Sequence, residues 1–447
     1  MRIALPTTGS RGDVQPFVAL GLGLQAAGHQ VLIATHADFE EFVRSHGLDF
    51  YPIEGNARAM QCGEVGDRMN QAGGNPFVFM REFVRLRLPI MNDLMRNCWE
   101  ACRDADAILL SNTAPLLGQA VAEKRGIPTC LASLQPTALS RYLPNCFMPQ
   151  APRWLPSRVY NLMSHVTMAE YLWQQVRRAV NKARQEVLGL PPLPLLGPAP
   201  GKIWGRLKLF GYSPLVVPKP PDWDADHHVT GYWFLDDGSA WEPPSDLAEF
   251  LDSGPPPIYI GFGCSYARDA DQVTNLVIRA LEHTGQRGIL TTGWGGLRRV
   301  DATDRLFSID SVPHDWLFPR MAAVVHHGGA GTTSAVLRAG VPGLVVPFTS
   351  DQPFWGRQVF KLGVGPQPLP RGELSFERLA EGIHEAVTNP ALQLRAKDFG
   401  RQIRREDGVG RAVELFQDYL GHRDSKVRQS AVSNNGRGRS QLEGVGG

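Results

Sequence analysis

Short apolar runs alternate with longer amphipathic segments in the first part of the chain. Residues 2–8 and 30–36 are β-like runs, and residues 14–27 between them have helical spacing. The runs 106–111 and 128–133 flank another helical stretch. Strands that alternate with helices in this order predict a parallel sheet covered by helices on both faces.

The same alternation returns in the second half of the chain. Five runs there predict strands, at residues 257–263, 288–293, 306–310, 322–327 and 343–348. We therefore expect an α/β protein with two doubly wound, Rossmann-like sheets. In such folds ligands bind at the carboxyl ends of the strands, so the two sheets are expected to face a common cleft.

A change of composition marks the passage between the two predicted domains. A helical segment at 162–188 is followed by proline-rich, loop-like sequence up to residue 257. We place the first domain at 1–215 and the second at 216–422, and leave open whether the last helix packs back on the first domain. Residues 423–447 are polar and glycine-rich, which predicts a disordered tail without chemistry.

Composition excludes several classes of protein. The 447 residues are 43% hydrophobic and 20% charged, as in globular proteins, and a net charge of +2 argues against nucleic-acid binding. Six cysteines without CxxC pairs, together with the lack of a signal peptide, favour free thiols in the cytoplasm. Cys98 and Cys102 are one helical turn apart but lack partner ligands for zinc. No apolar run is long enough to span a membrane.

The most informative stretch is "VVHHGGAGTTSAVLRAG" at 324–340. It predicts a strand, a glycine turn and the first turn of a helix. Free backbone N–H groups and the positive end of the helix dipole make such a helix start a phosphate-binding site. Histidine and threonine side chains add further donors. The alternative interpretation is a tight turn with one hydrogen-bonded histidine.

Three polar or aromatic residues add to this predicted site. Asp351 and Gln352 follow the run 343–348, and a carboxylate with an amide suits sugar hydroxyls. Helix capping by Ser350 or Asp351 is the alternative. Trp316 precedes the run 322–327, where its indole could stack on a nucleotide base or belong to the core.

These motifs carry a resemblance to a known family. The run "VPHDWLFPRMAAVVHHGGAGTT", the later "AGVPGLVVPF" and "DQPFWG", and the amino-terminal "PTTGSRGDVQPFVALGLGLQAAGHQV" are similar to glycosyltransferase family 1, enzymes of the GT-B fold. The nearest branch is that of sterol 3-β-glucosyltransferases and bacterial natural-product glycosyltransferases. The resemblance implies an acceptor-binding first domain and a nucleotide-sugar-binding second domain. It implies that Trp316 stacks on the nucleotide base and that Asp351 and Gln352 hold the sugar. The diphosphate contacts that it implies come from His326, Gly328, Gly329, Ala330, Gly331 and Thr332.

The loop after the first strand faces the cleft from the opposite domain. Asp13 is placed to accept the proton of an attacking acceptor hydroxyl, and the resembling branch has aspartate there. The alternative is that Asp13 only caps the next helix. Ser10, Arg11 and Gly12 share the loop and are expected to approach the donor. The fingerprint-like "GLGLQAAG" at 21–28 lies inside the predicted helix and is rejected as a dinucleotide site.

Two further segments depart from a simple interpretation. Cys264 stands where the family usually has serine, which leaves the role of the following Ser265 open. The stretch 75–95 is apolar and carries Arg81, Arg85 and Arg87, which suits either peripheral contact with a membrane surface or a domain helix with solvent-facing arginines.

Taken with the resemblance, the motifs predict an inverting, metal-independent hexosyltransferase that needs no cofactor. The expected donor is a UDP-sugar or a dTDP-sugar, with glucose as the expected hexose, and the expected acceptor is a hydroxyl of a sterol, glycolipid or polyketide. The absence of a suitably placed DxD-like motif agrees with this expectation. A nucleotide-sugar epimerase and a non-catalytic nucleotide-sugar-binding protein are the alternatives. Release of nucleoside diphosphate in the presence of an acceptor separates a transferase from both.

Overall fold

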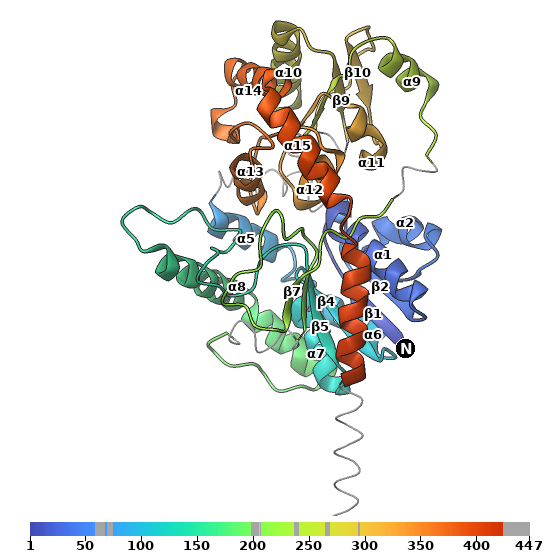
Figure 1. Ribbon diagram of the computed structural model, residues 1–447. Helices are drawn as coiled ribbons and strands as arrows, with labels where there is room; N and C mark the ends of the chain where they lie inside the picture. Colours follow the sequence, from blue (N-terminus) through green and yellow to red (C-terminus); the bar gives the residue numbers. More distant parts are fainter. Residues whose placement is uncertain are drawn as a thin grey trace, which may run out of the picture.

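The computed structural model describes residues 1–58, 68, 75–197, 205, 207–236, 241–263, 269–293 and 296–422. In these residues the strands form two separate sheets, and their strand pairs are parallel. Each sheet has its own helices, so the molecule consists of two α/β halves placed one above the other (Figure 1). The expected tail at 423–447 lies outside the described residues.

The first sheet has the strand order β3-β2-β1-β4-β5-β6-β7. Its strands are β1 (Arg2–Pro6), β2 (Gln30–Thr35), β3 (Asp49–Pro52), β4 (Ala107–Ser111), β5 (Thr129–Ser133), β6 (Lys208–Phe210) and β7 (His227–Val229). The strands predicted from apolar runs are present as β1, β2, β4 and β5. The sheet also extends to β7, beyond residue 215, where the first domain was expected to end. Proline-rich sequence around β7 hid this three-residue strand.

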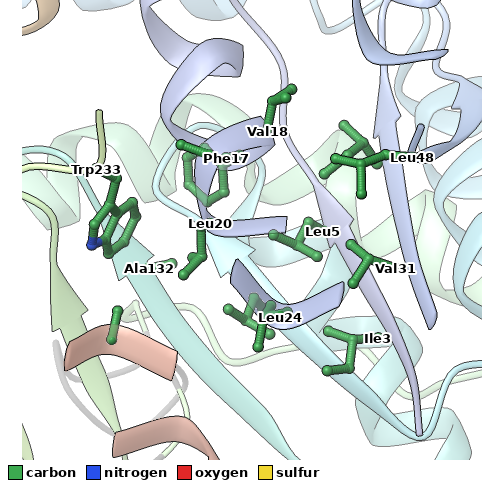
Figure 2. Close-up of a cluster of buried hydrophobic side chains, with 14 of the residues drawn as sticks. Ile3, Leu5, Phe17, Val18, Leu20, Leu24, Val31, Leu48, Ala132 and Trp233 are labelled. Atoms are coloured by element: carbon green, nitrogen blue, oxygen red, sulfur yellow. The ribbon is translucent and has the colours of Figure 1, made fainter. Parts of the chain in front are cut away.

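Helices cover both faces of the first sheet. One face carries α1 (Arg11–Ala26), the 3-10 turn η1 (Ala37–Phe39) and α2 (Glu40–Ser45). Figure 2 shows Ile3 and Leu5 of β1 facing Phe17, Leu20 and Leu24 of α1. The other face carries α6 (Met91–Cys102), α7 (Pro115–Arg125) and the long α8 (Ser157–Leu188), and α5 (Pro76–Arg85) packs on α8.

The second sheet has the strand order β10-β9-β8-β11-β12. Its strands are β8 (Ile258–Gly261), β9 (Gly288–Thr291), β10 (Leu306–Ile309), β11 (Ala323–His326) and β12 (Gly343–Val345). On one face lie α10 (Ala270–Thr284) and α14 (Phe376–Thr388). On the other lie α9 (Ser245–Asp252), α11 (His314–Leu317), the 3-10 turn η2 (Phe318–Arg320) and α12 (Ala330–Ala339).

The two halves are joined by an apolar cluster and by the end of the chain. Phe210, the last residue of β6, and Tyr212 just after it pack with Phe354 and Trp355 of α13 (Gln352–Lys361). Near α13, the 3-10 turn η3 (Arg371–Glu373) precedes α14, and α15 (Pro390–Ile403) then leads out of the second half. The cluster buries apolar surface between the halves, which favours a fixed arrangement of the two sheets.

The last helix, residues 408–422, crosses back and packs on the first sheet beside α1 (Figure 1). Phe416 and Leu420 of this helix are buried with Phe17. A Cβ on Gly23 of α1 would lie 2.4 Å from Cγ1 of Val409, so only glycine allows this close approach. Gly23 therefore serves helix packing, and Gly28 has φ of +87° just beyond the end of α1, in agreement with the rejection of a dinucleotide site.

Candidate active site

The carboxyl ends of β1 and β11 lead into helices whose amino termini meet across the cleft. α1 follows β1 and α12 follows β11. A Cβ on Gly331 of α12 would lie 3.8 Å from Cα of Gly12 in α1. Two helix starts from opposite domains thus face one space, and both present the positive ends of their dipoles to it.

Asp13 lies in the first turn of α1, not in the preceding loop. The N–H and Oγ–H of Ser10 both donate to its Oδ2, at 2.8 and 2.9 Å. Gly9 has φ of +130°, and a Cβ there would lie 2.4 Å from the same oxygen, so glycine is required at this turn. The capping geometry considered as an alternative is therefore present.

The environment of Asp13 is also suited to proton transfer. Burial raises the pKa of its carboxyl above the ordinary value, opposed by the two hydrogen bonds from Ser10. The hydrogen bonds to this carboxylate within the described chain go to Oδ2, which leaves Oδ1 for an incoming proton. The negative charge of Asp351 of the second domain also raises the pKa of Asp13.

Arg87 is a site residue that sequence analysis missed. Its guanidinium lies 3.7 Å from the centre of the Phe83 ring, and its Nη2 donates to Oγ1 of Thr8 at 3.5 Å. Burial lowers its pKa to about 10, opposed by the charge of Asp13. Arg81 and Arg85 instead point to solvent around Glu82. The interpretation as a domain helix with exposed arginines thus holds for two of the three, because Arg87 follows α5 and turns inward.

The glycine turn at the start of α12 has the geometry predicted for an anion site. Gly328 has φ of +90°. The N-cap is Gly329, which has no side chain that could occupy the free N–H groups of the first turn. The N–H groups of Ala330, Gly331 and Thr332 occupy the first three helical positions, where an α-helix has no internal acceptors. Gly331 is exposed and Thr332 is partly exposed toward the cleft side of the helix start.

The two adjacent histidines have different environments. His326 is fully buried, and its Nδ1 accepts a hydrogen bond from the N–H of Gly328 at 3.1 Å. Its side chain belongs to the core below the turn, so the structure does not present His326 to a diphosphate. His327 is partly exposed, and its Nε2 lies 2.7 Å from where a Cβ on Gly329 would be. His326 is the last residue of β11 and His327 is the first residue beyond it, so the two side chains leave the backbone in different directions.

His327 belongs to a group that spans the two domains. Burial lowers its pKa to about 4, opposed by the backbone of Gly261, so its ring is neutral near pH 7. The pKa of His314 is lowered to about 4 by burial and by the charges of Arg11 and His327. The charge of Arg11 of the first domain therefore reaches His314 of the second domain. Its guanidinium also lies 4.5 Å from the Phe42 ring centre.

Trp316 is separated from these residues. Its ring packs edge-on against Trp241 at 5.0 Å and under the guanidinium of Arg320 at 4.1 Å. It lines a cavity of about 320 Å³ together with Pro256 and Pro257. These prolines precede β8, whereas the cleft lies at the carboxyl end of that strand. The structure therefore does not bring Trp316 to the predicted donor site. Residues two apart in a helix point in different directions, and it is His314 of α11 that lies near Arg11 and His327.

Asp351 is buried at the start of α13 and is held from both domains. Trp355 Nε1 and Gln135 Nε2 donate to its Oδ2, at 2.7 and 3.1 Å. Gln135 follows β5 in the first domain, and its Oε1 accepts from Asn112 Nδ2 at 2.6 Å. Burial raises the pKa of Asp351, opposed by Trp355 and Gln135. Ser350 before it has φ of +61°, a strained conformation for a residue other than glycine.

Gln352 lies beside the glycine turn. Its Oε1 accepts from the N–H groups of Phe348 and Thr349, at 2.8 and 3.2 Å. Its backbone oxygen lies 3.2 Å from where a Cβ on Gly328 would be. The structure thus brings Asp351, Gln352 and the start of α12 together, as the sequence predicted. Cys264 and Ser265 lie outside the described residues.

Comparison with known proteins identifies the family. Residues 3–144 match the glycosyltransferase family 28 N-terminal domain, and residues 297–406 match the erythromycin biosynthesis protein CIII-like C-terminal domain. Two sterol 3-beta-glucosyltransferases of Arabidopsis thaliana are 37% and 35% identical over 94% of the chain, which corresponds to 66% and 68% of their own lengths. The chain belongs to the sterol 3-beta-glucosyltransferase family. It covers only 30% of the length of a Neosartorya fischeri sterol 3-beta-glucosyltransferase that is 36% identical over 97% of the chain.

Solved structures confirm the GT-B fold expected for this glycosyltransferase family. The glycotransferase of kitacinnamycin has a TM-score of 0.67 at 19% identity, covering 93% of this chain and 98% of that one. The calicheamicin glycosyltransferase CalG4 has a TM-score of 0.66 at 18% identity, covering 94% and 98%. VinC, solved in complex with dTDP, has a TM-score of 0.62 at 18% identity, covering 93% and 99%. The resemblance seen in the sequence motifs is thereby confirmed.

Proposed function

We propose that the protein transfers a hexose, glucose in the first instance, from a UDP-sugar or dTDP-sugar to a hydroxyl of a hydrophobic acceptor such as a sterol. The observation that carries the proposal is the meeting of Asp13 with the uncapped start of α12 across one cleft. Its relatives are sterol 3-beta-glucosyltransferases, and two structural neighbours were solved with dTDP.

In the proposed reaction Asp13 acts as the general base. Its Oδ1 takes the proton of the acceptor hydroxyl while the acceptor oxygen forms a bond to the anomeric carbon. The bond from that carbon to the diphosphate oxygen breaks on the opposite side, so one displacement inverts the anomeric centre. Ser10 holds Oδ2 and thereby fixes the direction of Oδ1.

The start of α12 stabilises the leaving diphosphate in this proposal. N–H groups of residues 330–332 point out of the helix end, and hydrogen bonds from such groups to a charged acceptor are stronger than neutral ones. We assign the hydrogen bond from a histidine ring to the diphosphate to His327 instead of His326. With a pKa of about 4 the His327 ring is neutral near pH 7 and still carries one N–H donor. No metal ion is assigned a role in this scheme.

Asp351 and Gln352 are proposed to hold the sugar. They lie between the start of α12 and Gln135, so a hexose on the diphosphate reaches them. Asp351 accepts hydrogen bonds, and a sugar hydroxyl would add to, or replace, the one from Gln135. We do not assign binding of the nucleotide base to Trp316, because this residue lies at the cavity beside Pro256 and Pro257.

The direct test is to incubate the full chain with UDP-glucose or dTDP-glucose and a panel of sterols and other apolar alcohols, and to follow product mass. We expect a monoglycoside and an equal amount of nucleoside diphosphate, also in the presence of EDTA. Asp13→Asn should abolish the product, and the exposed Asp49→Asn provides a control with the same charge change. Diphosphate release without glycoside, or full loss of activity in EDTA, would contradict the scheme.

A further inference from the structure

A second cavity lies between the domains, next to the proposed sugar site. Its volume is about 110 Å³, and its walls come from the start of α5, from the segment 146–149 and from residues 349–357. Phe79, Phe147, Met148 and Pro353 make most of the lining apolar. One side chain in it is charged, that of Arg357 on α13.

Arg357 lacks a partner for its charge. In the described part of the chain its guanidinium forms no hydrogen bond and no ion pair, although it is partly buried. Burial lowers its pKa, opposed by Tyr160 and Cys146. Asp351 lies on the same helix, but its carboxylate is engaged by Gln135 and Trp355. A cation that is partly removed from water without a counter-charge is costly unless a ligand supplies one.

The position of α5 connects this cavity with the proposed base. Phe79 of α5 lines the cavity, and Arg87, just beyond the end of α5, lies near Asp13. From Phe79 to Arg85, the last residue of α5, six residue steps at helical rise span about 9 Å, and Arg87 lies two residues further on. An apolar acceptor with its hydroxyl at Asp13 that lay along this segment would have its far end at the cavity and Arg357.

We propose that the cavity binds a carboxylate at the far end of the acceptor and that Arg357 forms a charge-assisted hydrogen bond with it. This inference rests on the proposed function and makes it more specific: the preferred acceptor is an acidic amphiphile with a hydroxyl at one end. A guanidinium matches the planar geometry of a carboxylate, and the apolar walls exclude water around the pair.

The test compares two acceptors that differ only in charge, a 3β-hydroxysteroid whose side chain ends in a carboxylate and its methyl ester. With UDP-glucose we expect kcat/KM of the wild type to favour the acid by about 10-fold, the worth of one charge-assisted hydrogen bond. Arg357→Gln should lower the acid-to-ester ratio to near one, and Arg357→Lys should restore part of it. Lys361→Gln, an exposed change on the same helix, should leave the ratio as in the wild type.

Equal kcat/KM values for acid and ester in the wild type, or an acid-to-ester ratio that Arg357→Gln leaves unchanged, would overturn the proposal. An Arg357-dependent preference for UDP-glucuronate over UDP-glucose with a neutral sterol would also overturn it, by assigning the carboxylate to the donor.

Calorimetric binding of the acid in the presence of UDP tests the site apart from catalysis. Tighter binding of the acid to wild type than to Arg357→Gln without any turnover would keep the site and reject the transferase. Equal binding would reject the site.

Discussion

At the scale of single residues, Asp13 combines a capping role with the proposed base. Its pKa is raised by burial above the ordinary value of 3.8, so the folded protein binds this proton more tightly than the unfolded chain does. The resulting stabilisation is present at pH values below the unfolded pKa and is lost as the pH rises through the folded pKa. At neutral pH the ionised carboxylate of Asp13 therefore destabilises the folded state. The same ionised form is the one that accepts the proton in the proposed reaction.

Asp13→Asn is predicted to separate these two effects. We expect kcat to fall by about 10³-fold, within the usual range for loss of a general base. At pH 7 the melting temperature should rise, because the cost of an ionised buried group is removed, and the gain should vanish at acid pH. Wild-type kcat/KM should rise with pH through the raised pKa. A lower melting temperature of the variant at pH 7 would show that capping, not ionisation, dominates at this position.

The sequence places a residue in the fold where a motif fixes the backbone, but it does not give the direction of a side chain. Asp13, Asp351 and the glycine turn lie where the sequence placed them. The pattern "HH" at the end of β11 requires the two rings to point to opposite sides, but only the structure shows that His327 takes the cleft side. Trp316 lies at a cavity away from the other site residues, and apolar spacing alone does not give the rotation of the four-residue helix α11.

At the scale of elements, the start of α12 is the part of the fold most directly shaped for a ligand. We predict that UDP slows amide hydrogen exchange in residues 328–334 more than uridine does, since only UDP carries the diphosphate that these N–H groups would bind. Helix α14, which has its own side-chain cap from Ser375, is the internal control. Mass spectrometry of peptic peptides measures both. Equal protection by UDP and uridine would place the diphosphate elsewhere.

Element prediction was good for strands that lie within long apolar runs, and it missed β3, β6 and β7. Nine apolar runs gave nine strands, because a strand buried on both faces of a parallel sheet reads as a continuous apolar run. β6 and β7 have three residues each, and β7 is only partly buried, so neither has a periodic signal. Arg87 follows the end of α5, and helical periodicity says nothing of a side chain beyond the last turn.

At the scale of the whole molecule, the two domains are tied by contacts that no local pattern contains. The helix 408–422 leaves the second domain and packs on the first, and Gln135 of the first domain reaches Asp351 of the second. In the described residues no helix is long and apolar enough to cross a membrane. Peripheral contact through residues 75–95 stays a prediction.

We predict that the returning helix stabilises the first domain. Phe416 is 1% exposed and packs in the core cluster that contains Phe17, so Phe416→Ala should lower the free energy of unfolding by about 3 kcal/mol or more. Chemical denaturation followed by the fluorescence of the core Trp233 measures this loss, and the exposed Leu394→Ala serves as the control. An unchanged midpoint for Phe416→Ala would mean that the helix is not part of the folded core in solution.

The most direct test of the central claim is the anomeric configuration of the glycoside formed from UDP-glucose, in which glucose is α-linked. A single displacement with Asp13 as base predicts a β-glycoside, identified by the proton coupling at the anomeric carbon in NMR spectra. An α-glycoside would contradict the account, since retention requires a different mechanism from proton removal by Asp13 in one step.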